Sequence, residues 1–266
     1  VKRALTEDLG GGDLTAALIP AEQRATASVI SREAAVICGR PWFDEVFRQL
    51  DAAIVTEWRV DEGARVSAGS PLCTLRGLAR PLLAGERVAL NFLQTLSATA
   101  TTTRAYLEAM GEGETQLLDT RKTIPGLRQA QKYAVRCGGG VNHRMGLYDG
   151  ILIKENHIAA AGSITRAVAA ARSQAPAGKV VEIEVEDLVE VEEALAAGAD
   201  ILLLDNMDRA QMAQAVALNA GRARLEASGN ITLENIAAVA ATGVDRISIG
   251  ALTKHLRAID LSMRFD

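Results

Sequence analysis

The spacing of apolar and polar residues divides the chain into two parts with different rhythms. In the first part, amphipathic helical patterns alternate with short runs that are rich in β-branched residues and therefore favour strands. Glycines and a proline punctuate short apolar runs between residues 60 and 72, which is typical of hairpins. The expected elements are helices at 1–9, 42–50 and 82–110, the last as one bent helix or two, and strands at 26–31 and 53–60.

From residue 116 onward the pattern becomes a repeat of strand, loop and helix. Such alternation predicts parallel strands joined by right-handed helical crossovers. Six units in so short a stretch favour a barrel over an open sheet. The expected strands are at 116–118, 150–153, 180–185, 201–204, 222–226 and 246–249, with helices at 164–173, 188–197, 210–219 and 233–241.

Composition narrows the class of protein. The 266 residues are enough for one α/β domain and a smaller partner, and a net charge of −4 argues against a nucleic-acid partner. Three widely separated cysteines without a CxxC pair indicate a reducing compartment and no disulfide or metal framework. No apolar run is long enough for a membrane span. We therefore expect a cytoplasmic protein, with further N-terminal sequence before the helical pattern at Val1.

Polar residues follow every predicted strand of the second part. In a parallel α/β barrel the carboxyl ends of the strands meet at one mouth, where working residues gather. We therefore expect these polar groups to form a single site. They are the segments 119–123, 154–156, 205–206 and 228–230, together with Glu184 and Gly250.

Basic side chains are concentrated at this expected mouth. Arg121, Lys122 and Lys154 directly follow strands, and His143 and Arg144 follow three glycines that permit close backbone approach. Arginine matches carboxylates and phosphates with a planar fork, and lysine acts as a point charge. In an acidic protein, this concentration predicts an anionic small-molecule ligand.

Three other basic residues of the same region receive a different interpretation. Arg128, Lys132 and Arg136 are spaced four residues apart, which places them along one stripe of a helix. A stripe of this kind is usually a solvated surface. We therefore expect these three side chains to be exposed.

Two carboxylates are candidate metal ligands. Glu184 and Asp205 each stand at or near the end of a buried apolar strand, in neighbouring units. A few oxygen ligands suit Mg²⁺ that is bound together with a phosphorylated substrate. Pairing of both carboxylates with nearby Arg or Lys is the alternative. Glu182 and Glu186 share a face with Glu184 and are weaker candidates.

Glycine-containing turns after the last two strands are candidate phosphate sites. Ser228, Gly229 and Asn230 follow one strand, and Gly250 follows the other. Backbone N–H groups in such late loops of barrels commonly bind phosphate. The residues thus predict an anion-handling α/β-barrel enzyme that uses Mg²⁺ and a phosphorylated substrate, without defining the reaction.

Seven sequence blocks lead to a family. They are EDLGGGDLT at 7–15, GERVALNFL at 85–93, DTRKTIPG at 119–126, GGGVNHR at 138–144, IKENH at 153–157, LLDN at 203–206 and EASGNIT at 226–232. Together, and in this order, they resemble the signature blocks of quinolinate phosphoribosyltransferases. The resemblance extends over essentially the whole chain.

The resemblance implies a fold and an assembly. It implies an N-terminal α/β sandwich domain at 1–98, completed by the C-terminal tail 251–266, beside an incomplete parallel α/β barrel at 99–250. It also implies a homodimer, or a higher oligomer built from it, whose active sites take residues from both chains.

The resemblance further implies a reaction, in which phosphoribosyl pyrophosphate and quinolinate give nicotinate mononucleotide, CO₂ and pyrophosphate on the way to NAD. Lys122, Glu184 and Asp205 would be catalytic, with the two carboxylates facing the ribose hydroxyls and Mg²⁺. Thr123 lies in the same loop as Lys122. Ser228, Gly229, Asn230 and Gly250 would hold the 5′-phosphate. Quinolinate and the neighbouring phosphate would be bound by Arg87 of the partner subunit, Arg121, Lys122, His143, Arg144 and Lys154.

Two alternatives remain open at this stage. A related phosphoribosyltransferase, acting on nicotinate or encoded with molybdenum genes, would have the same fold. A substrate with one carboxylate would not need six basic and imidazole groups, however. A non-catalytic anion-binding or carrier module is suggested by the hairpins at 60–72, which resemble those of lipoyl and biotinyl carriers. The lysine that such carriers modify is absent.

Overall fold

The computed structural model describes residues 1–176 and 178–266, which form two compact units. We call them the N-terminal unit and the barrel unit. The boundary expected at 98–99 lies inside one long helix, α3 (Ala79–Met110), which contributes residues to both. The N-terminal unit comprises Val1–Thr102, Tyr133–Gly138 and Leu256–Asp266, and the barrel unit comprises Thr103–Lys132 and Gly139–His255.

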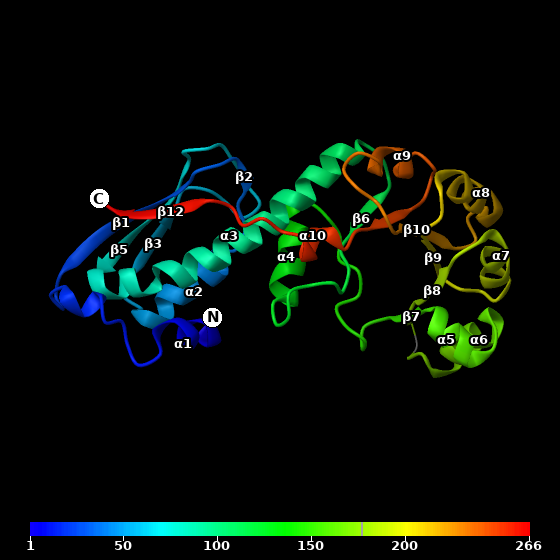
Figure 1. The fold of residues 1–266 in the computed structure, drawn as a ribbon, viewed down its shortest axis with the longest axis horizontal. Helices are drawn as coiled ribbons and strands as arrows, with labels where there is room; N and C mark the ends of the chain where they lie inside the picture. The colour runs from blue at the N-terminus through cyan, green and yellow to red at the C-terminus, as the bar shows by residue number, and fades with distance from the viewer. Residues whose placement is uncertain (177) are drawn as a thin grey trace. The chain divides into compact units, whose positions relative to one another are not determined.

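The N-terminal unit is a four-stranded antiparallel sheet covered by helices (Figure 1). The strand order is β12-β1-β5-β3, so the C-terminal strand pairs with the first one. A separate two-stranded ribbon joins β2 to β4. The elements are α1 (Lys2–Leu9), β1 (Arg24–Ser31), β2 (Ala35–Val36), α2 (Arg40–Leu50), β3 (Val55–Trp58), β4 (Arg65–Val66), β5 (Pro71–Leu78) and β12 (Leu261–Phe265).

The core of this unit lies between the sheet and the helices. Alternate residues of β1, including Ala27 and Val29, are fully buried, as expected for a sheet with one covered face. They share a cluster with Phe43 and Phe47 of α2, whose rings meet edge to face at 5.1 Å. Helix α3 adds leucines such as Leu93 to the same cluster.

The barrel unit is a six-stranded parallel sheet in the order β6-β11-β10-β9-β8-β7. In the described residues its end strands, β6 and β7, do not pair with each other, so the barrel is incomplete. The strands are β6 (Gln116–Leu118), β7 (Ile151–Ile153), β8 (Val181–Val185), β9 (Ile201–Asp205), β10 (Arg224–Ser228) and β11 (Arg246–Ser248). The helices are α4 (Arg128–Gly138), whose residues from Tyr133 onward belong to the N-terminal unit, and α5 (Glu155–Ala161), α6 (Ile164–Gln174), α7 (Leu188–Ala196), α8 (Arg209–Asn219), α9 (Ile236–Ala240) and α10 (Ala251–Lys254).

The mixed α/β fold and the six parallel strands expected from the sequence are confirmed. Short polar residues cap the amino ends of three of the predicted crossover helices. Ser163, Asp187 and Asp208 accept hydrogen bonds from the third backbone N–H of α6, α7 and α8. The short helix α5 was not predicted, because seven residues span too few turns to show a period.

The sequence pattern at 82–110 was compatible with one bent helix or with two, and the structure has one helix there, α3. It is a single helix of 32 residues. Neither it nor any other helix in residues 1–176 and 178–266 combines the length and apolar character needed to cross a membrane.

Candidate active site

A cavity of about 730 Å³ opens at the carboxyl ends of the parallel strands. We call it the carboxyl-end cavity. Residues at the carboxyl ends of all six strands, or just after them, line it, because parallel strands bring their carboxyl ends to one edge of the sheet. Eight of the site residues expected from the sequence meet here. They are Lys122, Lys154, Glu184, Asp205, Ser228, Gly229, Asn230 and Gly250.

Two carboxylates face this cavity from neighbouring strands. The Glu184 carboxylate pairs with the ammonium group of Lys154, and the side-chain amide of Asn206 donates to Asp205 at 3.0 Å. The Lys154 side chain keeps 46% of its surface exposed, so this pair is accessible to an anion. Two carboxylates suit Mg²⁺ that takes its other ligands from water and substrate phosphate.

The loops after β9 and β10 are in close contact, because the backbone at Gly229 packs directly against Asn206. Gly229 has φ +96°, and a Cβ atom there would lie 2.1 Å from the Oδ1 atom of Asn206. Asn206 and Asn230 also have positive φ values, of 55° and 53°, and their side chains share a hydrogen bond of 3.2 Å. Backbone strain of this kind persists only where the surroundings enforce it. These loops therefore present a preformed, narrow rim to a ligand.

The loop after β6 is anchored from helix α4. The Arg128 guanidinium donates to Thr123 Oγ1 at 3.1 Å and to the Arg121 carbonyl oxygen at 3.3 Å. The side chain of Gln131 accepts from the backbone N–H of Ile124 at 2.8 Å. Arg128 is therefore partly buried and structural, contrary to the expected solvated stripe. The Nε atom of Arg121 is buried without a hydrogen-bond partner among the described residues.

Lys132 is the clearest correction to the sequence interpretation. It is 1% exposed and forms a buried ion pair with Asp119, and it also donates to the His143 carbonyl oxygen at 2.7 Å. Burial raises the pKa of Asp119 and lowers that of Lys132, because both charges leave water, and their contact opposes both shifts. The prediction of an exposed stripe is wrong at Lys132 because tertiary packing covers that side of α4. Of the three basic residues on this helix, only Arg136 is exposed.

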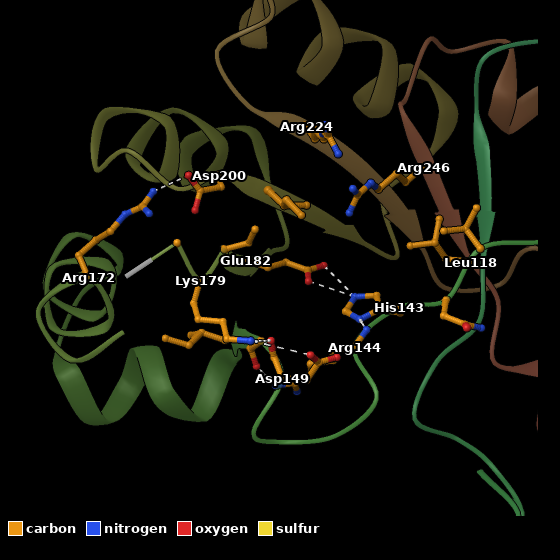
Figure 2. A pocket seen from close by; sticks show the side chains of 17 residues that line it. Leu118, His143, Arg144, Asp149, Arg172, Lys179, Glu182, Asp200, Arg224 and Arg246 are labelled. Atoms are coloured by element: carbon orange, nitrogen blue, oxygen red, sulfur yellow. Dashed lines mark hydrogen bonds and ion pairs between the residues drawn. The ribbon is translucent and has the colours of Figure 1, made fainter. Parts of the chain in front are cut away.

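His143 faces the interior of the barrel unit, beside a second cavity of about 610 Å³ near the amino ends of the strands (Figure 2). Its Nδ1 atom accepts from the backbone N–H of Arg144 at 2.7 Å, and its Nε2 atom lies 3.0 Å from the Glu182 carboxylate. Burial lowers the pKa of His143, but Glu182 and Glu226 raise it more. The Arg144 N–H nevertheless requires an unprotonated Nδ1, which leaves a neutral ring with its proton on Nε2.

Glu226 is the most unusual carboxylate of this interior. It is completely buried, and neither oxygen has a hydrogen-bond partner in the described chain. Burial, followed by the negative charge of Glu182, raises its pKa to about 7. Donor atoms of His143, Glu182 and Glu226 lie within 4.8 Å of one another. The proton on His143 Nε2 argues against a metal there, because it is directed to Glu182 at 3.0 Å, with Glu226 at 3.6 Å.

Arg144 also lines the second cavity, and a neighbouring arginine influences it. Burial lowers the pKa of Arg144, and the positive charge of Arg121 lowers it further. The Arg144 guanidinium donates to the Gly150 carbonyl oxygen at 2.8 Å, which holds it in place. The negative charges of Glu182, Glu184 and Asp149 oppose both effects on the pKa of Arg144.

Arg87 is the one predicted site residue outside the barrel unit. It is an exposed side chain on α3, within the part of that helix that belongs to the N-terminal unit. The site predicted from the sequence also lacked several residues that line the carboxyl-end cavity, notably Tyr106, Lys254 and His255. No local pattern marks these three. A charged residue inside a predicted buried strand could have marked Glu226.

Comparisons with known proteins give the same family from several directions. The model of the N-terminal domain of quinolinate phosphoribosyl transferase matches residues 13–97, and that of its C-terminal domain matches residues 99–264. The chain is 44% identical to nicotinate-nucleotide pyrophosphorylase [carboxylating] of Mycobacterium leprae, covering 99% of this chain and 95% of that protein. It is 37% identical to quinolinate phosphoribosyltransferase [decarboxylating] 1b of Nicotiana tabacum, covering 100% and 81%.

A solved structure agrees with these relatives. The nicotinate-nucleotide pyrophosphorylase of Francisella tularensis superimposes with a TM-score of 0.96 at 48% identity, covering 100% of this chain and 94% of that one. The two family models together account for most of the described sequence. The chain therefore belongs to the quinolinate phosphoribosyl transferase family.

Proposed function

We propose that this protein transfers the phosphoribosyl group of phosphoribosyl pyrophosphate to quinolinate, with loss of one carboxylate as CO₂. The products are nicotinate mononucleotide and pyrophosphate, which makes this a step of NAD biosynthesis. The observation that carries the proposal is the carboxyl-end cavity, which combines three lysines, three carboxylates and glycine loops. The relatives named for this activity support it.

Quinolinate is a dianion, and the arginines suit it. Arg121 retains a buried Nε–H without a partner in the described chain, and it lies close enough to lower the pKa of Arg144. A dianion would satisfy the free donor and relieve the repulsion between the two guanidinium groups. Lys154 would add a third cation by exchanging Glu184 for a ligand carboxylate. We therefore assign these three residues to quinolinate. Arg121 and Lys154 follow the carboxyl ends of β6 and β7, whereas Arg144 lines the second cavity and would have to reach the ligand from there.

Phosphoribosyl pyrophosphate would lie across the opposite side of the carboxyl-end cavity. The rim formed by Ser228, Gly229 and Asn230, with Gly250, offers backbone N–H groups to the 5′-phosphate. Glu184 and Asp205 would hold Mg²⁺, directly or through water and the ribose hydroxyls. When bound, Mg²⁺ would neutralise the diphosphate charge.

The chemistry requires positioning and charge more than a protein nucleophile. Departure of pyrophosphate leaves positive charge on the ribose, which the carboxylates of Glu184 and Asp205 would stabilise. Lys122 would hold the leaving phosphate as a point charge. The pyridine nitrogen of quinolinate attacks the sugar and becomes positively charged. That charge stabilises the carbanion at the neighbouring carbon when the 2-carboxylate leaves as CO₂, and the carbanion then takes a proton from water to give nicotinate mononucleotide.

We also propose a homodimer in which Arg87 of the partner subunit completes the quinolinate site. Arg87 is exposed on α3 and therefore available to a neighbour. A cytoplasmic location, expected from the cysteine usage, stays a prediction.

One assay separates the candidate functions. Purified protein is incubated with phosphoribosyl pyrophosphate, Mg²⁺ and either quinolinate or nicotinate, and CO₂ and nicotinate mononucleotide are measured. We expect both products from quinolinate in equal amounts. Mononucleotide from nicotinate alone would indicate the related phosphoribosyltransferase. Binding of both ligands without turnover would indicate an anion-binding module.

A further inference from the structure

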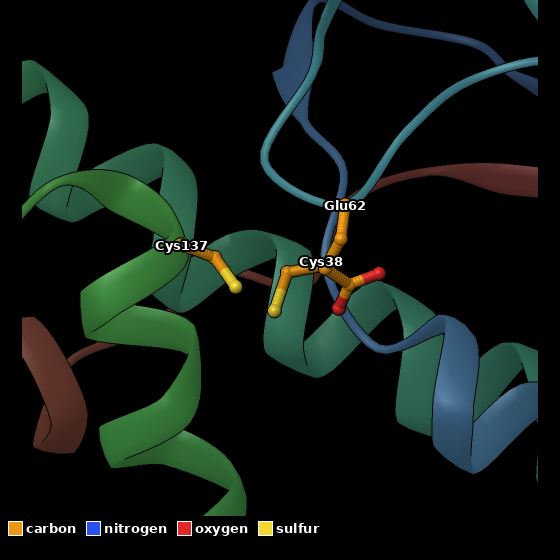
Figure 3. Close-up of side chains that lie close together, drawn as sticks. All are labelled: Cys38, Glu62 and Cys137. Carbon is orange, nitrogen blue, oxygen red and sulfur yellow. The ribbon is translucent and has the colours of Figure 1, made fainter.

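Two cysteines that are far apart in the sequence meet in the N-terminal unit. Cys38 precedes α2, and Cys137 lies in the last turn of α4. Figure 3 shows their sulfur atoms pointing toward each other, and both sulfurs and a Glu62 carboxylate oxygen lie within 4.8 Å of one another. Cys38 is fully buried, whereas Cys137 is partly exposed. The pair thus has one accessible and one protected thiol.

The third member of the cluster already has a structural task. The Glu62 carboxylate accepts from the backbone N–H groups of Gly39 at 2.6 Å and Arg40 at 3.2 Å, at the start of α2. It thereby satisfies N–H groups that a helix leaves unpaired at its beginning. Two thiols are too few ligands for a closed tetrahedral metal site. The cluster is therefore better described as a thiol pair beside a capping glutamate.

The hydrogen bonds around the pair distinguish the two thiols. Cys38 donates to the sulfur of Cys137, which lowers the pKa of Cys137, and Tyr133 lowers it further against the effect of burial. The same contact, together with burial, raises the pKa of Cys38. The accessible thiol is thus the one that ionises more readily, which is the arrangement of an oxidisable cysteine with a resolving partner.

We propose that Cys38 and Cys137 are a dithiol oxidation site, which hydrogen peroxide converts to a reversible disulfide. The Cys137 thiolate attacks one peroxide oxygen, the O–O bond breaks, and the departing hydroxide takes a proton to become water. Cys38 then loses its proton and attacks the sulfur of the resulting sulfenic acid, whose S–O bond breaks to release a second water. In total the two thiols give up two electrons and two protons. A small-molecule dithiol reduces the disulfide again by returning the two electrons and two protons.

The position of Cys137 connects this site to the proposed active site, and this part rests on the proposed function. Cys137 directly precedes the glycines at 138–140, and the chain then reaches Asn142, His143 and Arg144. Forming the disulfide draws the last turn of α4 from contact distance to bonding distance. Because α4 also carries Lys132, which holds the His143 carbonyl oxygen, the bond would displace the segment that presents Arg144.

Mass spectrometry tests the site independently of activity. The full-length protein is treated with hydrogen peroxide, its free thiols are alkylated after unfolding, and it is digested without reductant. We expect a peptide that links Cys38 to Cys137 and disappears with dithiothreitol. The link should be lost in Cys137→Ala and retained in Cys73→Ala, whose cysteine is buried elsewhere in the core.

Three results would overturn the proposal. Both thiols could remain alkylatable, Cys137 could oxidise beyond sulfenic acid while Cys38 stays a thiol, or Zn²⁺ could protect both thiols until a chelator is added. The last result would replace the dithiol with a metal site.

Kinetics test the connection to the active site. With quinolinate as substrate, we expect kcat/KM to fall by about tenfold on oxidation, since misplacing binding groups by about 1 Å costs up to about a hundredfold. Cys38→Ala should resist this fall. An unchanged kcat/KM in cross-linked protein would refute the connection. Activity of the reduced protein is measured separately, so a failed proposed function cannot be mistaken for a failed oxidation site.

Discussion

At the scale of single residues, environment separates side chains of the same type. Lys154 and Lys132 each pair with a carboxylate, but Lys154 is half-exposed in a cavity and Lys132 is completely buried. A ligand can compete for the first pair, whereas breaking the second strands a charge in the interior. The same contrast separates Glu184, which faces the cavity, from Glu226, which is enclosed.

Truncating the expected quinolinate contacts should weaken binding and leave the fold intact. We expect Arg121→Ala and Lys154→Ala each to cost roughly 1.5–3 kcal/mol of quinolinate binding, the value of a charge-assisted hydrogen bond. Both residues lie in loops after strands, so their loss leaves no core cavity. Calorimetric titration measures the effect, with exposed Arg136→Ala as the matched control. Wild-type affinity in a folded variant would remove that residue from the site.

Asp205→Asn should change the requirement for metal and phosphoribosyl pyrophosphate and spare quinolinate. The amide keeps the size of the carboxylate but loses the charge that suits Mg²⁺. We expect a higher Mg²⁺ concentration for half-maximal activity and near-normal quinolinate binding. The opposite pattern, with weakened quinolinate binding and unaltered metal dependence, would reverse the roles of the acidic and basic groups.

Glu226 should make the stability of the protein depend on pH. Its pKa is about 7 in the folded protein and 4.5 for an ordinary glutamate, so between these values only the folded state binds the proton. The free energy of unfolding should therefore fall as the pH rises from 4.5 to about 7, and no further above it. Glu226→Gln should remove this fall and raise stability at pH 8, on the order of 1–3 kcal/mol.

Urea unfolding of both proteins at pH 5 and pH 8 measures the difference. Parallel stability changes in the wild type and Glu226→Gln would show that this carboxyl does not titrate as the fold implies.

At the scale of elements, side chains of α4 hold the loops that carry the proposed binding residues. Arg128 and Gln131 hold the loop after β6, and Lys132 holds both Asp119 and the segment before Arg144. None of these three side chains lines the carboxyl-end cavity. The helix therefore determines where the binding groups stand without touching the ligand.

Lys132→Ala should be among the most damaging substitutions in this helix. It leaves Asp119 buried without its cation, which typically costs about 3–5 kcal/mol. Removing both charges, in Lys132→Met with Asp119→Asn, should recover a large part of that loss. Thermal unfolding compares the variants, with Arg136→Ala on the same helix expected within about 0.5 kcal/mol of wild type. A double variant no more stable than the single one would show that packing, and not charge, dominates.

At the scale of the whole molecule, the proposed homodimer would bring the barrel unit of one chain a residue that this unit does not contain. The quinolinate groups belong to the barrel unit, whereas Arg87 belongs to the N-terminal unit and is exposed. Activity should consequently depend on protein concentration wherever the dimer dissociates.

Complementation tests whether Arg87 acts in the neighbouring subunit. Arg87→Ala and Lys154→Ala chains, each expected to lose most activity at a low quinolinate concentration, are mixed and allowed to exchange. A mixed dimer then has one site with both wild-type groups and one with neither, and about half of the dimers are mixed. Activity should return to about a quarter of the wild-type level. Demonstrated exchange without recovery would place the arginine within its own chain's site.

The sequence by itself determined the periodic elements and the residues that follow them. Apolar runs and helical periods depend on local spacing, so all six strands of the barrel unit and the meeting of Lys154, Glu184 and Asp205 at one edge could be predicted. The carboxyl ends of parallel strands lie at the same edge of the sheet, so residues at those ends must lie near one another. The family blocks added the reaction, which no period encodes.

Tertiary structure alone decided which charges are buried and which distant residues meet. Lys132 lies on a stripe that looks solvated, and only packing against Asp119 buries it. The same holds for Cys38 and Cys137, whose separation along the chain indicates no contact. Burial and long-range contacts depend on how whole elements pack against one another. The spacing of residues along one helix or strand does not indicate which other elements will pack against it.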